Sequence, residues 1–176
     1  MKKIYIIGAL KNDNITGISA ELRSKYDVFD QWITPGPEAD QYLFEYSKKR
    51  GWNYKEALTC YAARNNFEFD KRHIDSSDIV VMVMPAGKSA HLELGYSIGM
   101  GKEAHILFDK EPERFDLMYN FVPVENIHFD IESLHLFSFK TPILLGKKIR
   151  KNVKSIVGIS PTMVLLFHLP CFYLKM

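Results

Sequence analysis

The stretch that decides the fold runs DKRHIDSSDIVVMVMPAGKSAHLELGYSIGMGK over residues 70–102. It places the apolar, β-branched run Ile79–Met84 before the turn residues Pro85 and Gly87, and a segment of helical character follows from Ser89. This order predicts a buried strand, a tight turn and then a helix. A strand–turn–helix unit of this kind is the building block of an α/β protein.

Three other apolar runs have the same character, at residues 3–7, 26–29 and 104–108. Helical segments are predicted between them, at residues 16–25, 54–73 and 89–101. Strands that alternate with helices form a parallel sheet covered on both faces. We therefore expect an α/β three-layer sandwich, with a flavodoxin- or Rossmann-like parallel sheet of about four to five strands.

Ligands of open α/β sheets bind at the carboxyl ends of the strands, so the loops after Ile7, Phe29 and Met84 are expected to form the site. The turn-rich residues 30–40 and the aromatic-rich residues 40–53 are interpreted as a long insertion over that end of the sheet. Its aromatic side chains either stack on a ligand or cover the core; they include Trp32, Tyr42 and Trp52.

The charge is unevenly distributed along the 176 residues. All 21 acidic residues lie at or before Glu132, and seven of the 23 Lys and Arg follow Ser138. Residues 1–138 therefore carry sixteen basic and 21 acidic groups, a net charge of −5. That balance argues against a nucleic-acid-binding surface, and the length suits one domain over residues 1–138.

Residues 139–176 form an atypical basic and apolar extension without a clear amphipathic period. Residues 155–174 are twenty consecutive uncharged positions, which is long enough for a membrane span. Pro161, Pro170 and His168 weaken that interpretation. A terminal helix, a subunit contact or an added extension is preferred to membrane association.

The two cysteines, Cys60 and Cys171, form neither a CxxC pair nor a spaced ligand set. His73 and His91 lack metal-ligand spacing as well, so neither a metal nor another cofactor is expected. The short apolar run after Met1 is more typical of a first strand than of a signal peptide. These features favour a cytoplasmic location.

Glu93 is the candidate for chemistry. It follows Ser89, the expected N-cap, by four residues, so both should lie on one face near the helix start. A capping box needs a spacing of three, so that structural role fits imperfectly, whereas a surface glutamate that favours the helix dipole stays open. A carboxylate near a helix N-terminus is favoured in its ionised form, which suits a nucleophile.

The upstream acids Asp70 and Asp75 are candidates to lie above the strand ends, whereas Asp78, directly before the strand, is best explained as a turn residue. Gly87 permits the turn, and the free amides after it are suited to an anion.

Taken together, these residues resemble the nucleoside 2-deoxyribosyltransferase superfamily, which includes 2′-deoxynucleoside 5′-monophosphate N-hydrolases. The resemblance covers roughly residues 3–118 and depends on three motifs: residues 4–9 (IYIIGA), Asp70 with Asp78 eight positions later, and residues 89–95 (SAHLELG).

The resemblance implies a nucleoside or nucleotide substrate, with Glu93 as the nucleophile that attacks C1′ of the sugar. Asp70 would position the substrate or protonate the base. The resemblance also implies substrate contacts from Tyr5, Gly8, Ala9 and Ser89. The position of Asp75, the turn at Gly87 and the aromatic ring of Trp32 make these three residues further candidates for substrate contacts. Asn120 would be contributed by a neighbouring subunit of a homo-oligomer.

Three activities stay open. A transferase would pass the sugar to a second base, whereas a deoxynucleoside 5′-monophosphate N-hydrolase would pass it to water. The third is a non-catalytic nucleotide-binding or signalling module, because a fold does not fix a function.

Overall fold

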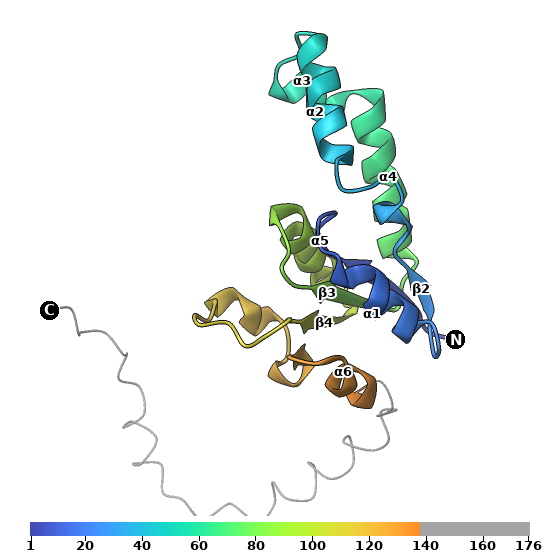
Figure 1. The fold of residues 1–176 in the computed structure, drawn as a ribbon, viewed down its shortest axis with the longest axis vertical. Helices are drawn as coiled ribbons and strands as arrows, with labels where there is room; N and C mark the ends of the chain where they lie inside the picture. Colours follow the sequence, from blue (N-terminus) through green and yellow to red (C-terminus); the bar gives the residue numbers. More distant parts are fainter. Residues whose placement is uncertain (138–176) are drawn as a thin grey trace, which may run out of the picture. The chain divides into compact units, whose positions relative to one another are not determined.

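A computed structural model describes residues 1–137. Its centre is a parallel sheet with the strand order β2-β1-β3-β4-β5 (Figure 1). The strands are β1 (Lys3–Ile7), β2 (Asp27–Phe29), β3 (Ile79–Val83), β4 (Glu103–Leu107) and β5 (Ile127–His128). The α/β fold predicted from the sequence is confirmed. The proposed membrane span and the rest of the extension at 139–176 lie outside the described residues.

The strands are buried because their side chains pack against both layers of helices. All five residues of β3 are buried, and β1 buries four of its five. Alternate side chains form two cores, with Tyr5 and Val80 in one and Ile4 and Val81 in the other. Since side chains of a strand alternate between faces, the two clusters lie on opposite faces of the sheet. Burial on both faces explains why the strand sequences are continuous apolar runs.

Each face is covered by helices. Helices α4 (Tyr61–Asp75) and α5 (Lys88–Gly99) supply Ile74, Ala90 and Leu94 to the first core. Helices α1 (Asn14–Leu22) and α6 (Ile131–Phe137) supply Ile15, Leu22 and Leu134 to the second. The three-layer arrangement expected from the sequence is therefore present.

The predicted helix over residues 54–73 is two helices, α3 (Tyr54–Thr59) and α4. Asn53 starts α3 with a capping box to Glu56. The break falls at Cys60, which ends α3 with an extended backbone (φ −65°, ψ 159°) and is the N-cap of α4, where its Sγ accepts from the amide of Ala63.

The segment interpreted as an insertion contains regular structure. It forms the 3-10 turn η1 (Gln31–Ile33) and helix α2 (Ala39–Lys49), which lies with α3 beside the first half of α4 (Figure 1). Two further 3-10 segments, η2 (Leu117–Phe121) and η3 (Val124–Asn126), precede β5. Within residues 1–137, no helix combines the length and the apolar character that crossing a membrane requires.

The strand order creates a natural place for a ligand. β1 pairs with β2 on one side and β3 on the other. The chain thus leaves β1 and β3 in opposite directions, which opens a crevice at the carboxyl ends of these strands.

Candidate active site

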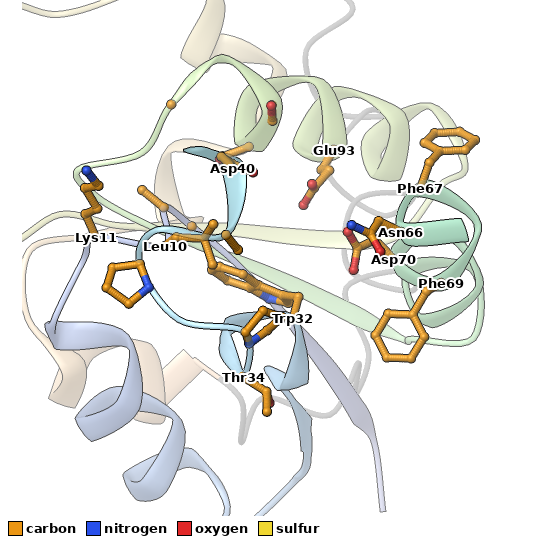
Figure 2. Close-up of a pocket in the computed structure, with 18 of the residues that line it drawn as sticks. Leu10, Lys11, Trp32, Thr34, Asp40, Asn66, Phe67, Phe69, Asp70 and Glu93 are labelled. Atoms are coloured by element: carbon orange, nitrogen blue, oxygen red, sulfur yellow. The ribbon is translucent and has the colours of Figure 1, made fainter. Parts of the chain in front are cut away.

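A pocket of about 870 Å³ lies at the carboxyl ends of the central strands (Figure 2). Four segments line it: the loop after β1 at residues 8–11, residues 31–41, residues 65–70 of α4, and residues 87–93 at the start of α5. It therefore occupies the crevice that the strand order creates. Seven of the residues predicted to form the site line it: Gly8, Ala9, Trp32, Asp70, Gly87, Ser89 and Glu93.

Helix α5 begins two residues earlier than the sequence predicts. Its N-cap is Gly87, with an extended backbone, and Ser89 is the second helical residue. The expectation that Ser89 is the N-cap was wrong, because glycine takes the extended cap conformation and the helix starts at Lys88. The hydroxyl of Ser89 is not used as a cap, and the residue lines the pocket.

Glu93 lies in the second turn of α5, with its carboxylate directed into the pocket (Figure 2). Burial raises its pKa to about 7, and the charge of Asp70 adds to the shift. The helix dipole alone predicts the opposite direction, a pKa below the usual value. Burial outweighs the dipole here because desolvation penalises a charged carboxylate strongly, whereas the dipole effect falls off within the first turn.

Asp70 approaches from α4, on the other side of the same space (Figure 2). Burial raises its pKa to about 6. Two carboxyl groups with raised pKa values in one pocket can share a proton near neutral pH. Such a pair is suited to a reaction that needs one ionised and one protonated carboxyl group.

Tyr5 lies in β1, fully buried below the pocket, and its ring stacks on Phe29 at 5.4 Å between centroids. Burial raises the pKa of its hydroxyl, and the charges of Glu93 and Asp70 raise it further. The hydroxyl therefore stays neutral within the field of both carboxylates.

Gly8 is where the backbone of the first loop approaches its neighbours most closely. A Cβ there would collide with Cδ1 of Ile15 and lie 3.6 Å from the ring of Trp32. Trp32 lines the pocket, packs against both cores, and donates from Nε1 to the carbonyl of Ile6 at 2.7 Å. It is therefore both a core residue and part of the pocket wall. Tyr42 and Trp52 do not line the pocket.

Two of the predicted site residues lie elsewhere. Asp75, at the end of α4, accepts from Nζ of Lys71 at 2.6 Å and from the hydroxyl of Tyr96 at 2.7 Å. Asn120, in η2, donates from its side chain to the carbonyl of Leu117. Asp78 accepts from the backbone amide of Lys3 at 2.8 Å, in agreement with a structural role.

Asn66 was not predicted from the sequence. It lines the pocket one helical turn before Asp70, and Figure 2 shows the two side chains side by side. Among the described residues, no side chain hydrogen bonds to it, so both its donor and its acceptor face solvent. The spacing of four residues before a candidate acid on a helix was the available signal.

Across residues 1–137, no group of three or more His, Cys, Asp or Glu side chains is arranged to hold a metal ion. His73 instead stacks on Phe29, with ring centroids 3.7 Å apart. The polar side chains that line the pocket carry carboxyl, amide, hydroxyl and ammonium groups.

Comparison with solved structures identifies a relative in fold. The fold resembles that of a 2-deoxyribosyltransferase. The match is to the enzyme of the psychrotolerant bacterium Bacillus psychrosaccharolyticus, with a TM-score of 0.52 and 19% sequence identity, over 78% of this chain and 93% of the other. No model of a known protein family matches the sequence, and no curated protein matches it either. At this identity the likeness concerns the fold.

Proposed function

We propose that the protein is a glycosyl-transferring enzyme that breaks the base–sugar bond of a nucleoside or nucleotide. The observation that carries this proposal is the pair Glu93 and Asp70, two partly buried carboxyl groups with raised pKa values that face one pocket from neighbouring helices. The fold relative, named as a 2-deoxyribosyltransferase, supports the choice of reaction class.

In the proposed reaction, ionised Glu93 attacks C1′ of the sugar. A bond forms between its carboxylate oxygen and C1′ as the bond from C1′ to the base nitrogen breaks. The electron pair of that bond leaves with the base, which takes a proton from Asp70. The carboxylate stabilises the oxocarbenium-like transition state and then holds the sugar as a covalent ester.

A second molecule then releases the sugar from Glu93. Water would give free sugar, and a second base would give a new nucleoside. Attack of either molecule at C1′ breaks the ester bond and returns the electron pair of that bond to Glu93. The attacking water or base loses a proton, which Asp70 accepts.

Tyr5 and the start of α5 support these steps in different ways. The neutral hydroxyl of Tyr5 lies in the field of both carboxylates and would help to hold Glu93 in place. Gly87, Lys88 and Ser89 line the pocket at a helix N-terminus, an arrangement that favours a negatively charged group. This favours a 5′-monophosphate as a second candidate substrate, and with it the N-hydrolase activity.

The role of Asn120 is also a proposal. Its position in η2, outside the pocket, is compatible with a contribution to the site of a second subunit in a homo-oligomer. Light scattering, combined with the activity of Asn120→Ala mixed with Glu93→Ala, tests this: recovered activity in the mixture would support shared sites.

The activity is tested by incubating the protein with deoxyribo- and ribonucleosides and their monophosphates, with and without a free acceptor base, and separating the products by chromatography. Release of a free base supports cleavage, and a new nucleoside made only when acceptor is present identifies a transferase. If the protein binds these compounds but turns none over, the non-catalytic binding module is the correct reading.

A further inference from the structure

A second hollow, of about 250 Å³, lies between α4 and α5. Three of its lining residues, Phe67, Asp70 and Glu93, also line the larger pocket. Figure 2 places these three at one end of the pocket. The hollow therefore opens from the point where the proposed chemistry takes place, and we refer to it as the α4–α5 groove.

Beyond the two carboxyl groups, the groove is lined by apolar surface from Phe67, Ile74, Leu92 and the ring of Tyr96. Leu92 is 76% exposed and Phe67 is 62% exposed. These two large apolar side chains are exposed beside the two catalytic candidates. An apolar group that covered them would be bound favourably, because burial of apolar surface lowers the free energy.

The polar groups at the far end of the groove are paired with one another. Nζ of Lys71 donates to Asp75 and lies 5.2 Å from the centre of the Tyr96 ring. The hydroxyl of Tyr96 donates to Asp75 as well. With these groups engaged, the groove offers hydrophobic contact and little hydrogen bonding.

The position of the groove relative to the sugar follows from the proposed mechanism. C1′ must lie against Glu93, and the base must lie against Asp70, which is on α4. The helix start with Lys88 and Ser89 is suited to the sugar or its phosphate, as argued above. The base therefore faces α4, and a substituent on the base would extend past Asp70 into the groove.

We propose that the α4–α5 groove binds an apolar substituent on the departing base, so that the preferred substrates carry an alkyl or aryl group on the exocyclic amine or the ring. The proposal rests on the function proposed above, because it uses the placement of C1′ at Glu93. Nucleosides with such a substituent are a substrate class that a polar pocket alone would not select.

The test uses deoxyadenosines that carry hydrogen, methyl, propyl, hexyl or benzyl on the exocyclic amino group. Affinity is measured by calorimetry and base release by chromatography, with the full chain. We expect both the affinity and kcat/KM to rise with chain length, by about threefold for each methylene that enters the groove.

Leu92→Asp is the diagnostic variant, because it places a charge on the groove wall at an exposed position outside the proposed catalytic pair. It should abolish the dependence on chain length. Turnover is measured at the pH optimum of each variant, because a new carboxylate beside Glu93 and Asp70 raises their pKa values. Leu58→Asp is the matched control, since Leu58 is 60% exposed on α3 and lines neither hollow. It should keep the dependence.

Several results would overturn the proposal. These are affinities that stay flat or fall with chain length in the wild type, or a chain-length dependence that survives in Leu92→Asp. A change of oligomeric state in Leu92→Asp, seen by light scattering together with weaker turnover of the unsubstituted nucleoside, would assign the groove to a subunit contact. Chain-length-dependent binding without any base release would retain the groove and refute the proposed reaction.

Discussion

Glu93 and Asp70 reach the same pocket from neighbouring helices, and the charge of Asp70 helps to raise the pKa of Glu93 to about 7. Neither carboxyl group belongs to an ion pair among the described residues. Groups that are desolvated and coupled in a pocket, with no structural partner, are typical of catalytic sites.

Glu93→Gln keeps the shape of the side chain and removes the nucleophile. We expect kcat for base release to fall by about 10³-fold or more, because the ester to C1′ can no longer form. The melting temperature should stay equal or rise, since a partly buried carboxyl group is replaced by a neutral amide. Stopped assays and thermal denaturation measure the two effects.

The matched control is Glu68→Gln, an exposed position on α4 that does not line the pocket. It should keep wild-type kinetics. Equal activity of Glu93→Gln and wild type would remove Glu93 from the mechanism.

The pH dependence of kcat/KM tests the sharing of a proton by the pair. Activity requires ionised Glu93 and protonated Asp70. Because the pKa of Glu93, about 7, lies above that of Asp70, about 6, the single proton of the pair resides mainly on Glu93, and the active arrangement is the minor form of the singly protonated pair. The pair should therefore give a bell-shaped profile with its maximum between these two values, because the singly protonated pair is the active form.

Asp70→Asn should change this profile in two ways. The alkaline limb should disappear because the proton donor is gone. The single limb that remains should report the pKa of Glu93 beside a neutral side chain, which lies below about 7 because the charge of Asp70 no longer raises it. An alkaline limb that persists in Asp70→Asn would exclude Asp70 as the proton donor.

Gly8→Ala tests the close packing of the first loop. The added Cβ meets Cδ1 of Ile15, a side chain that is 1% exposed and would have to shift within the core. We expect a loss of about 1–3 kcal/mol in the free energy of unfolding, measured with urea, and a raised KM as the loop shifts.

Gly17→Ala provides the control for Gly8→Ala, since it lies within α1 and its added Cβ meets nothing within 4 Å. It should stabilise the protein by about 0.5–1 kcal/mol through the helix preference of alanine. A loss of stability equal to that of Gly8→Ala would rule out the steric explanation.

A histidine pair outside the pocket should control stability in mild acid. Nδ1 of His105 and Nε2 of His128 are 3.0 Å apart between β4 and β5, and Nε2 of His105 lies 3.2 Å from Glu103. Burial lowers the pKa of His128 to about 4, with a further contribution from His105 and an opposing one from Asp130. Burial lowers the pKa of His105 as well.

Since the unfolded state binds protons near pH 6.5, the folded protein gains stability from these groups above that pH and loses it as the pH falls toward about 4. His128→Asn should be less stable at pH 7, where a buried hydrogen bond is lost, and should show a smaller decline between pH 7 and pH 4. Urea denaturation at a series of pH values measures both effects. If the free energy of unfolding of His128→Asn declined with pH as steeply as that of the wild type, the pH dependence would not come from the histidine pair.

Asp75→Asn tests a residue that the sequence suggested for substrate binding and the structure places outside the pocket. It removes the ion pair with Lys71, which is exposed and so contributes little to stability. We expect kcat/KM for unsubstituted nucleosides to stay within about twofold of wild type. A tenfold loss would return Asp75 to the list of substrate contacts.

The sheet could be predicted from the sequence because its strands are continuous apolar runs, as in residues 3–7 and 79–83. Strand β5 could not be predicted, because it is only two residues long and therefore shows no periodic pattern, and its pairing depends on β4. Helix α2 was missed because it buries only Ser47 and so lacks a clear apolar face.

The candidate site was predictable in its residue types and less so in its electrostatics. Glu93 and Asp70 stood out through their motifs, and the rule for parallel sheets predicted that the loops would converge. The raised pKa of Glu93 depends on how much of its side chain the surrounding elements bury, which is a property of tertiary packing. Asn66 was missed because an exposed amide on a helix is distinguished only by its spacing of four residues from Asp70, which is weak evidence when taken alone.

The pocket wall combines two kinds of backbone. Glu93 and Asp70 lie on α5 and α4, whose inner faces pack in the core. Residues 34–38 also line the pocket, but they belong to no helix or strand. For protein engineering, this separation makes residues 34–38 the place to randomise when a different sugar or base is wanted. Libraries confined to that loop would alter what enters the pocket and leave the reacting groups on their scaffold.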